Sequence, residues 1–514
     1  MKRYVYRFTT TNSNAKQDHA MGEVQRNLFE PEFNRSVKVQ GTDQRLTSNS
    51  GVVLLREADH RLELIDSIAL KVQDPRRPDR IRYQINELIR ERVFAMAIGC
   101  SAQDDLDRLA HDPAFRAAVW DRNGDQVVHE RLASQPTQSR LISILTRSAA
   151  NLEALRDGLA RGVESHVIAS GGRRVAHATI DIDSFPIEVH GKQHGAAYNG
   201  YYKQTVYHPL VASLSVGGDY DSAQNGKRLG NGFIHATLRQ GQVHTANGMQ
   251  RFVDKTDAKA HTIAQHVDYR LDAGYTIPAV MDALTSKNRR FTGRLKTNPK
   301  LDALAAEHIV RPPGRPPAGG YEYTVELGSY QIDTWQHAQR LILVVVDQPD
   351  SKTGQLNLMP RWFFLVTNWP QESRSADDLL AHYRKRGTFE DRLGEFNESI
   401  GVHLSSQAFK ANEATMLLAM LAFNLNTICR NELEDSVGGG WDMQRFILFV
   451  LKVGGEMIKH SRRLVLRIAE SAEPLWSKLI ARLKGWQSRA SQGVKASGFM
   501  PPPDHAHLSE VLRN

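Results

Sequence analysis

The spacing of apolar residues changes once along the chain, and this change limits the folds that the chain can adopt. Before Gly171-Gly172, apolar residues recur every three or four positions, as on the buried face of a helix. Residues 175–183 instead alternate between apolar and polar side chains, so Asp181 and Asp183 face one side of a predicted strand. The helices predicted before this point span residues 52–72, 80–98, 106–119 and 137–159. A helical region followed by strands predicts an α/β protein.

The next part of the chain resembles an α/β unit in which a strand ends in an acid. Residues 267–272 form a predicted strand that places Asp272 at its C-terminal end, and a further strand follows at 290–295. Between them, Pro278 opens a predicted helix to Ser286, because proline fits the first helical position. Strands at 202–206 and 210–216 and a helix at 250–264 precede this unit. Since open α/β sheets bind ligands beyond the carboxyl ends of their strands, we take Asp272 as a candidate site residue.

A β-rich insertion is predicted after this unit. A loop rich in Pro and Gly at 311–320 precedes three strand-like runs, and a helix at 409–433 is apolar on most faces. The three runs span residues 321–327, 340–346 and 362–367. We therefore divide the chain into an N-terminal arm (1–50), a helical region (51–165), a core in two parts (166–300 and 371–433), the β-rich insertion (301–370) and a basic helical C-terminal region (434–514).

Residues 377–397 are predicted to form one helix with an unusual polar face. At ~100° per residue, Tyr383, Arg386, Glu390 and Asn397 lie within roughly 60° of one another. A face that packs against a core should be apolar, so four aligned polar groups need another explanation. They form either a solvated surface with an ion pair or a site that binds a charged ligand.

Three acids are candidates for one catalytic centre. Asp183, Asp272 and Glu390 are separated by 89 and 118 residues, the first two on predicted strands and the third on a helix. Carboxylates that converge raise one another's pKa unless divalent cations lie between them. Ligands that are all oxygens suit Mg²⁺ or Mn²⁺, and two such ions can activate water or a 3′-hydroxyl for attack on a phosphodiester. This pattern predicts nuclease and strand-transfer chemistry.

The charge of the chain fits a polyanionic partner. The 514 residues include 66 Lys and Arg against 57 Asp and Glu, which gives a formal net charge of +9. Residues 287–300 contain six basic side chains and no acid, and Arg290, Arg294 and Lys296 are candidate DNA contacts.

Two cysteines exclude a disulfide framework. Without a signal peptide or a helix long enough to span a bilayer, we expect a cytoplasmic protein with no membrane partner.

The motifs around the acids resemble those of a known family. Tyr383-x2-Arg386-x3-Glu390, followed by position 397, is similar to the tyrosine, arginine, glutamate, lysine signature of bacterial insertion-sequence DDE transposases. Other stretches resemble the branch called the insertion-sequence 1380 family, transposase DDE domain group 1. These are Ile180-Asp181-Ile182-Asp183, Gly191-x-Gln193, Arg270-Leu271-Asp272-Ala273-Gly274-Tyr275, Phe409-x-Ala411-Asn412, Ala422-Phe423-Asn424-Leu425 and Leu109-Ala110-His111-Asp112-Pro113.

The resemblance implies a ribonuclease-H-like core interrupted by the β-rich insertion, with DNA-end binding by residues 51–165. It also implies an endonuclease and strand transferase that uses Mg²⁺, with Mn²⁺ as a substitute. Asp183, Asp272 and Glu390 would hold this metal ion. Its partners would be double-stranded DNA, as terminal inverted repeats and target, and a second copy of the chain in a synaptic complex on the bacterial nucleoid. Tyr383 and Arg386 would position a phosphate, together with the residue at 397.

Two positions depart from this pattern or leave it open. The signature lysine is Asn397 here, which removes a charge expected to touch DNA. Asp181 and Asp183 share one face, so strand alternation does not choose between them. We choose Asp183, because Ser184 after it matches the small hydroxylated residue of the family.

Two alternative functions remain from the sequence. The pair Asp181-x-Asp183 also occurs in phosphohydrolases of the haloacid-dehalogenase type, although Phe185 stands where that pattern has Thr or Val. A DNA-binding protein descended from a transposase but no longer catalytic is the second alternative, and the intact acids argue against it. Three histidines follow the first acid, and we expect them to be polar surface or sheet-edge groups rather than metal ligands. They are His190, His194 and His208.

Overall fold

The computed structural model describes residues 26–122, 124–216, 231–244, 246–311, 319–349, 359–461 and 463–486. Parts of several predicted segments lie outside the described residues. The longer stretches are residues 1–25 of the N-terminal arm, 217–230 of the first part of the core, 312–318 and 350–358 of the β-rich insertion, and 487–514 of the C-terminal region.

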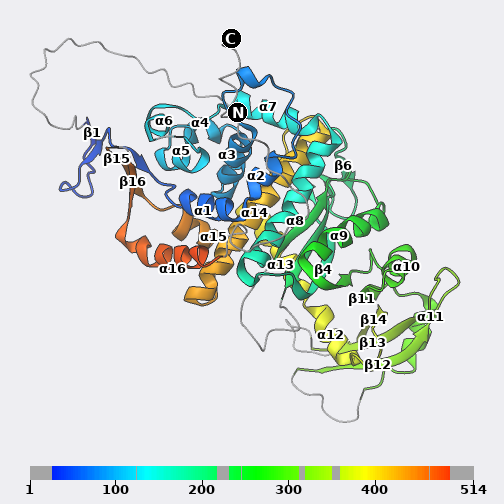
Figure 1. Cartoon of the computed structure of the whole chain (residues 1–514). Coiled ribbons are helices and arrows are strands. Elements are labelled where there is room, and N and C mark those ends of the chain that lie inside the picture. Colours follow the sequence, from blue (N-terminus) through cyan, green and yellow to red (C-terminus); the bar gives the residue numbers. More distant parts are fainter. Residues whose placement is uncertain are drawn as a thin grey trace, which may run out of the picture.

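An eight-stranded mixed sheet forms the centre of one half of the protein (Figure 1). Its strand order is β12-β13-β14-β11-β10-β4-β8-β9. The strands are β4 (Val175–Ser184), β8 (Leu210–Val216), β9 (Gly232–Thr237), β10 (Ala264–Leu271), β11 (Arg290–Leu295), β12 (Tyr321–Tyr330), β13 (Gln339–Asp347) and β14 (Arg361–Thr367). Together with the helices described below, this sheet confirms the mixed α/β class.

The three central strands β4, β10 and β11 are parallel, so their carboxyl ends lie at the same edge of the sheet. Ile182 on β4 pairs with Leu271 on β10, which in turn pairs with Gly293 on β11. The residues that follow this register are therefore neighbours along the edge. This arrangement brings Asp183 and Asp272 onto adjacent strands.

The β-rich insertion extends the central sheet instead of forming a sheet of its own. Its last strand, β14, pairs antiparallel with β11, where Arg294 lies opposite Leu365. β13 and β12 follow outward, also antiparallel. A helix, α11 (Pro299–Ala306), opens the insertion and packs Leu301 and Ala305 against these strands. The insertion is therefore continuous with the strands that carry the first two acids.

The N-terminal half of the protein is helical, as the sequence predicts. Its helices are α1 (Val52–Leu62), α2 (Leu64–Ala69), η1 (Pro78–Arg80), α3 (Ile85–Ala97), α4 (Asp105–Leu109), α5 (Pro113–Val119), α6 (Gly124–His129), α7 (Gln135–Thr146) and α8 (Ala149–Gly171). The prediction of a single helix over 137–159 is wrong, because these residues belong to two helices, α7 and α8. Ser148 caps α8, and its hydroxyl accepts a hydrogen bond of 3.1 Å from the Asn151 amide.

The helices of the second half are α9 (Met249–Ile263), α10 (Pro278–Ser286), α12 (Ala376–Arg384), α13 (Gly387–Ser399), α14 (Phe409–Val437), α15 (Met443–Phe446), the π-helical turn η2 (Ile447–Leu451), η3 (Glu470–Ala472) and α16 (Glu473–Lys484). Helix α14 is buried on most faces and packs against α3, α7 and α8 (Figure 1). It joins the helical half to the sheet. Among the described residues, no helix is long and apolar enough to cross a membrane.

One buried amide fixes α14 against the sheet. Asn424 donates to the Phe233 carbonyl at 2.7 Å and accepts from the Phe233 amide at 2.9 Å, which completes the backbone pairing of β9. Gly232 makes this approach possible, because a Cβ there would lie 2.8 Å from Val163 and 3.0 Å from the Asn424 oxygen. The motif residue Asn424 is thus a structural contact between helix and strand.

The C-terminal region is not wholly helical. It contains a hairpin of β15 (Gly455–His460) and β16 (Arg463–Ile468), and β15 pairs with β3 (Leu46–Thr47) of the N-terminal arm. Alternating exposure along β16 reflects the period of two that its sequence carries. The remaining short strands are β1 (Arg26–Phe29), β2 (Val39–Gly41), β5 (Ile187–Glu188), β6 (Ala197–Asn199) and β7 (Gln204–Tyr207).

We expect Asn424→Ala to destabilise the protein, because it leaves the buried amide and carbonyl of Phe233 without partners. The expected cost is about 1–3 kcal/mol for each group. Thermal unfolding followed by circular dichroism measures it, with Asn397→Ala, an exposed asparagine on α13, as the control. Equal melting temperatures for the two variants would contradict the role of Asn424.

Candidate active site

The first two acids lie side by side where β4 and β10 end. Asp183 is the ninth residue of β4, and Asp272 directly follows β10. The Asp183 carboxylate accepts a hydrogen bond of 2.7 Å from the amide of Ser184. The backbone carbonyl of Asp272 accepts from the amides of Tyr275 and Thr276, and these bonds shape the turn that follows the strand. The turn holds Asp272 at the sheet edge.

The third acid lies on α13, and the structure divides the helix predicted over 377–397. The backbone stays helical, but at the junction its hydrogen bonds close over three residues: the Arg386 amide donates to the Tyr383 carbonyl at 3.0 Å. A tighter turn rotates the two helices relative to each other, so one regular helix does not describe this face. Tyr383 therefore belongs to α12, and Glu390 and Asn397 belong to α13.

The apolar face of α13 anchors it on the sheet side of the protein. Its buried residues are Phe389, Leu393 and Phe396. The Phe396 ring packs edge-on against Phe233 of β9 and Phe423 of α14, with ring centres 5.6 and 5.5 Å apart. This packing fixes the side of α13 that turns toward the acids.

Arg386 joins the strand acid to the helix acid. Its guanidinium donates to Glu390 at 2.5 Å and, through its other terminal nitrogen, to Asp183. Arg386 is 7% exposed, whereas the Glu390 side chain is 61% exposed. The structure therefore brings the three predicted acids into one neighbourhood, with a buried cation between two of them.

Burial and charge shift the pKa values of this group. Burial raises the pKa of Asp183, the charge of Asp272 adds to that rise, and Arg386 opposes it. Burial alone would lower the pKa of Arg386, but the charge of Asp183 and the neighbouring acidic groups outweigh it, so the net shift is upward. Arg386 consequently stays charged at neutral pH.

Tyr383 and Arg294 lie at the same edge. Burial raises the pKa of the Tyr383 phenol, against the charges of Arg386 and Arg294. Arg294 is one residue beyond Gly293, which places it level with Asp272, and its guanidinium lies over the Phe363 ring. The chain thus adds an exposed positive charge beside the acids.

The other predicted DNA contacts are more scattered. Arg290 begins β11, at the opposite end from the acids, and donates to the Asn368 carbonyl at 2.6 Å. Lys296 is exposed just past the end of β11, and Asn397 is exposed on α13. Of the basic run, the structure brings Arg294 and Lys296 to the acid edge and leaves Arg290 away from it.

The two candidate first acids have different surroundings. Asp181 is 1% exposed, and its oxygens accept from Arg270 at 2.8 and 2.6 Å. Arg270 also donates to the His382 carbonyl at 2.9 Å. Asp181 is thus engaged in a buried ion pair that ties β4, β10 and α12 together. Asp183, one pleat further along, faces Arg386 and Asp272.

A buried polar cluster beside Asp183 was missed from the sequence. The Tyr275 hydroxyl donates to the Ser184 oxygen at 2.6 Å, and that oxygen lies 2.7 Å from His208 Nε2. His208 is 5% exposed, and burial lowers its pKa to about 4, so it is neutral near pH 7. The prediction of a surface or sheet-edge histidine was wrong at His208. The position of Tyr275, three residues after Asp272, was the available signal.

The three acids have the oxygen donors that a divalent cation needs, but their side chains are not spaced to hold one. Asp183 and Asp272 offer oxygen donors on adjacent strands, as Mg²⁺ prefers. Within the described ranges, however, no three His, Cys, Asp or Glu side chains lie close enough together to hold a metal ion. The reason is visible in the contacts: the guanidinium of Arg386 lies between Asp183 and Glu390.

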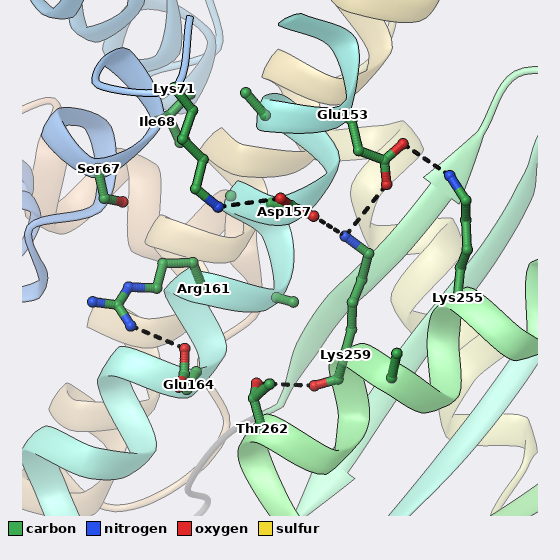
Figure 2. Close-up of a pocket in the computed structure, with 14 residues that line it drawn as sticks. Ser67, Ile68, Lys71, Glu153, Asp157, Arg161, Glu164, Lys255, Lys259 and Thr262 are labelled. Atoms are coloured by element: carbon green, nitrogen blue, oxygen red, sulfur yellow. Dashed lines mark hydrogen bonds and ion pairs between the residues drawn. The ribbon is translucent and has the colours of Figure 1, made fainter. Parts of the chain in front are cut away.

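A separate pocket of about 590 Å³ lies between α2, α8 and α9 (Figure 2). Its basic side chains are already paired. Lys71 and Lys259 bind Asp157, and Lys255 binds Glu153. Arg161 on its wall pairs with Glu164. The pocket is therefore largely self-neutralised.

Comparison with known proteins identifies the family. Residues 29–486 match the family described as Transposase DDE domain group 1, a range that includes all three acids. The chain belongs to this family. Among solved structures it is similar to piggyBac transposase in a cryo-EM synaptic complex with hairpin DNA. That match has 12% identity and a TM-score of 0.36, and it covers 79% of this chain and 81% of the other. The comparison with curated proteins found no match.

We expect Asp181→Asn to unfold more easily than the wild type, because it removes the negative charge that pairs with the buried guanidinium of Arg270. Breaking a buried ion pair costs about 3–5 kcal/mol. Calorimetric melting of Asp181→Asn measures the loss. The double variant Asp181→Leu/Arg270→Met removes both charges and should recover part of it. If Asp181→Asn melts at the wild-type temperature, the pair is not structural.

Proposed function

We propose that this chain is a DDE transposase that cuts DNA at the ends of an insertion sequence and joins those ends to target DNA. The reactions are phosphodiester hydrolysis and transesterification with divalent metal ions. The observation that carries this proposal is the grouping of Asp183, Asp272 and Glu390 around Arg386 in a chain of the transposase family.

The strand order supports a ribonuclease-H-like core. β4, the first strand of the sheet, lies in its interior, with β8 and β9 following antiparallel on one side and β10 and β11 following parallel on the other. In that arrangement the first acid lies on the first strand and the second acid follows the fourth. The signature residues and the motif at Arg270–Tyr275 support placement in the insertion-sequence 1380 branch.

Asp183, Asp272 and Glu390 would hold Mg²⁺ or Mn²⁺, which when bound activates the attacking oxygen and stabilises the leaving one. Arg386 presents a planar fork of donors that suits a phosphate as well as a carboxylate. Tyr383, Arg294 and Lys296 add an aromatic surface and positive charge at the same edge. These groups position the DNA strand while the acids perform the chemistry.

The two alternative functions fit less well. A phosphohydrolase of the haloacid-dehalogenase type would use Asp181 as its nucleophile, but this carboxylate is buried and bonded twice to Arg270. A catalytically inactive descendant would not need three acids grouped around one cation. The proposed partners are terminal inverted repeats, target DNA and a second copy of the chain, in a protein of net charge +9 that acts on the bacterial nucleoid.

We expect Asp183→Asn, Asp272→Asn and Glu390→Gln each to abolish Mg²⁺-dependent cleavage of DNA that carries the element's ends. Each substitution removes a charge that the metal needs but changes little shape. A plasmid nicking assay measures cleavage, and gel shift without metal measures binding, which should persist. Cleavage by Asp183→Asn would reject Asp183 as the first acid.

A second prediction concerns the departure from the family signature at Asn397. Its side chain is exposed, so a lysine there can extend toward DNA without disturbing the packing of α13. We expect Asn397→Lys to keep cleavage and to tighten end binding by about 1 kcal/mol, the scale of a charge-assisted hydrogen bond's advantage. Affinity at one fixed salt concentration tests this. Weaker binding by the lysine variant would mean that position 397 does not face DNA.

A further inference from the structure

A second pocket, of about 520 Å³, lies in the helical half of the protein and is rimmed by arginines. Its walls come from the segment that leads into α3, from α4 and from α7. Five arginines line it, against a single acid, Asp107, whose carboxylate accepts from the Gln135 amide. The five are Arg76, Arg80, Arg82, Arg131 and Arg140.

Most of these guanidinium groups have no carboxylate partner. Arg76 is bonded to Asp74, and Arg82 lies over the ring of Tyr83. The side chains of Arg80, Arg131 and Arg140 are exposed and form no ion pair with any described residue. This contrasts with the pocket of Figure 2, where the lysines and the arginine are paired with acids. Here the chain concentrates positive charge and leaves it unneutralised.

The elements that carry these arginines are packed against one another. Its floor is apolar and includes Leu88, Leu132 and Leu141. The Tyr83 hydroxyl donates to the Arg131 carbonyl at 2.9 Å, which holds the segment before α7 against the segment before α3. The three unpaired arginines therefore project from elements that are packed together.

We propose that this pocket binds phosphates of the DNA backbone, as a second contact far from the acids. The inference rests on the proposed function, because it assumes that DNA is the partner. Helix α7 and the segment before α3 lie across the protein from α12 (Figure 1), so one duplex that reaches both sites must lie along the molecule. Unpaired guanidinium groups around one opening match the regular negative charge of a phosphate backbone.

The test compares how two triple variants of the full chain respond to salt. Arg80→Gln/Arg131→Gln/Arg140→Gln removes the unpaired charges of the pocket. The control, Arg77→Gln/Lys71→Gln/Lys255→Gln, removes three exposed charges that are already paired with Asp79, Asp157 and Glu153. Affinity for a fluorescent DNA duplex is measured between about 50 and 200 mM salt in EDTA, so that no cleavage occurs.

We expect the pocket variant to lower the slope of log affinity against log salt by roughly 2 to 3, about 0.9 for each lost phosphate contact. The control should keep the wild-type slope. Arg80→Lys/Arg131→Lys/Arg140→Lys should also keep it, because the charges remain, and this rescue separates lost contacts from misfolding.

The outcomes distinguish the two proposals. If the wild type binds duplex DNA and the pocket variant has the slope of the control, the pocket assignment fails and the proposed function stands. If the lysine variant loses the slope although it folds, the charges are not what binds, and the assignment also fails. If the wild type shows no salt-dependent binding of DNA, both proposals fail.

Discussion

Carboxylates that converge at one edge of a sheet repel one another, and here the guanidinium of Arg386 holds two of them together. It contacts Asp183 on a strand and Glu390 on a helix, and it is almost fully buried. Burial and the charge of Asp272 raise the pKa of Asp183, and the charge of Arg386 opposes that rise more strongly than the hydrogen bond from the Ser184 amide does. The rest of the structure places these charges and keeps them in position.

Two structural devices position the site. The parallel strands bring Asp183 and Asp272 to one edge, and the bonds of Arg270 to Asp181 and to the His382 carbonyl tie those strands to α12. Burying two charges carries a desolvation penalty, and the attraction between the charges offsets this penalty only when the geometry of the pair is good. Its value here is that it fixes α12, which ends two residues before Arg386. The β-rich insertion continues the same sheet and places the Phe363 ring beneath the guanidinium of Arg294.

Local signals predicted much of this fold. The helix Pro278–Ser286 and the strand Arg290–Leu295 have the predicted bounds, because proline at a helix start and alternation along a strand act within a few residues. Longer-range contacts decided the rest. No proline and no earlier glycine marks the tight turn before Gly387, and Asp181 differs from Asp183 only because cross-strand register pairs it with Arg270. His208 is buried by contacts with Ser184 and Arg239, which no sequence spacing reveals.

We propose that Arg386 occupies the place between the acids that a divalent cation would take. Mn²⁺ binding without DNA, followed by electron paramagnetic resonance, tests this directly. Arg386→Met should bind Mn²⁺ at least about fivefold more tightly than the wild type, because about 1 kcal/mol of charge repulsion at 4 Å is removed even in bulk water. Arg384→Met, which removes an exposed charge two residues away, should bind as the wild type does. Equal or weaker binding by Arg386→Met would show that Arg386 does not occupy the place of the metal ion.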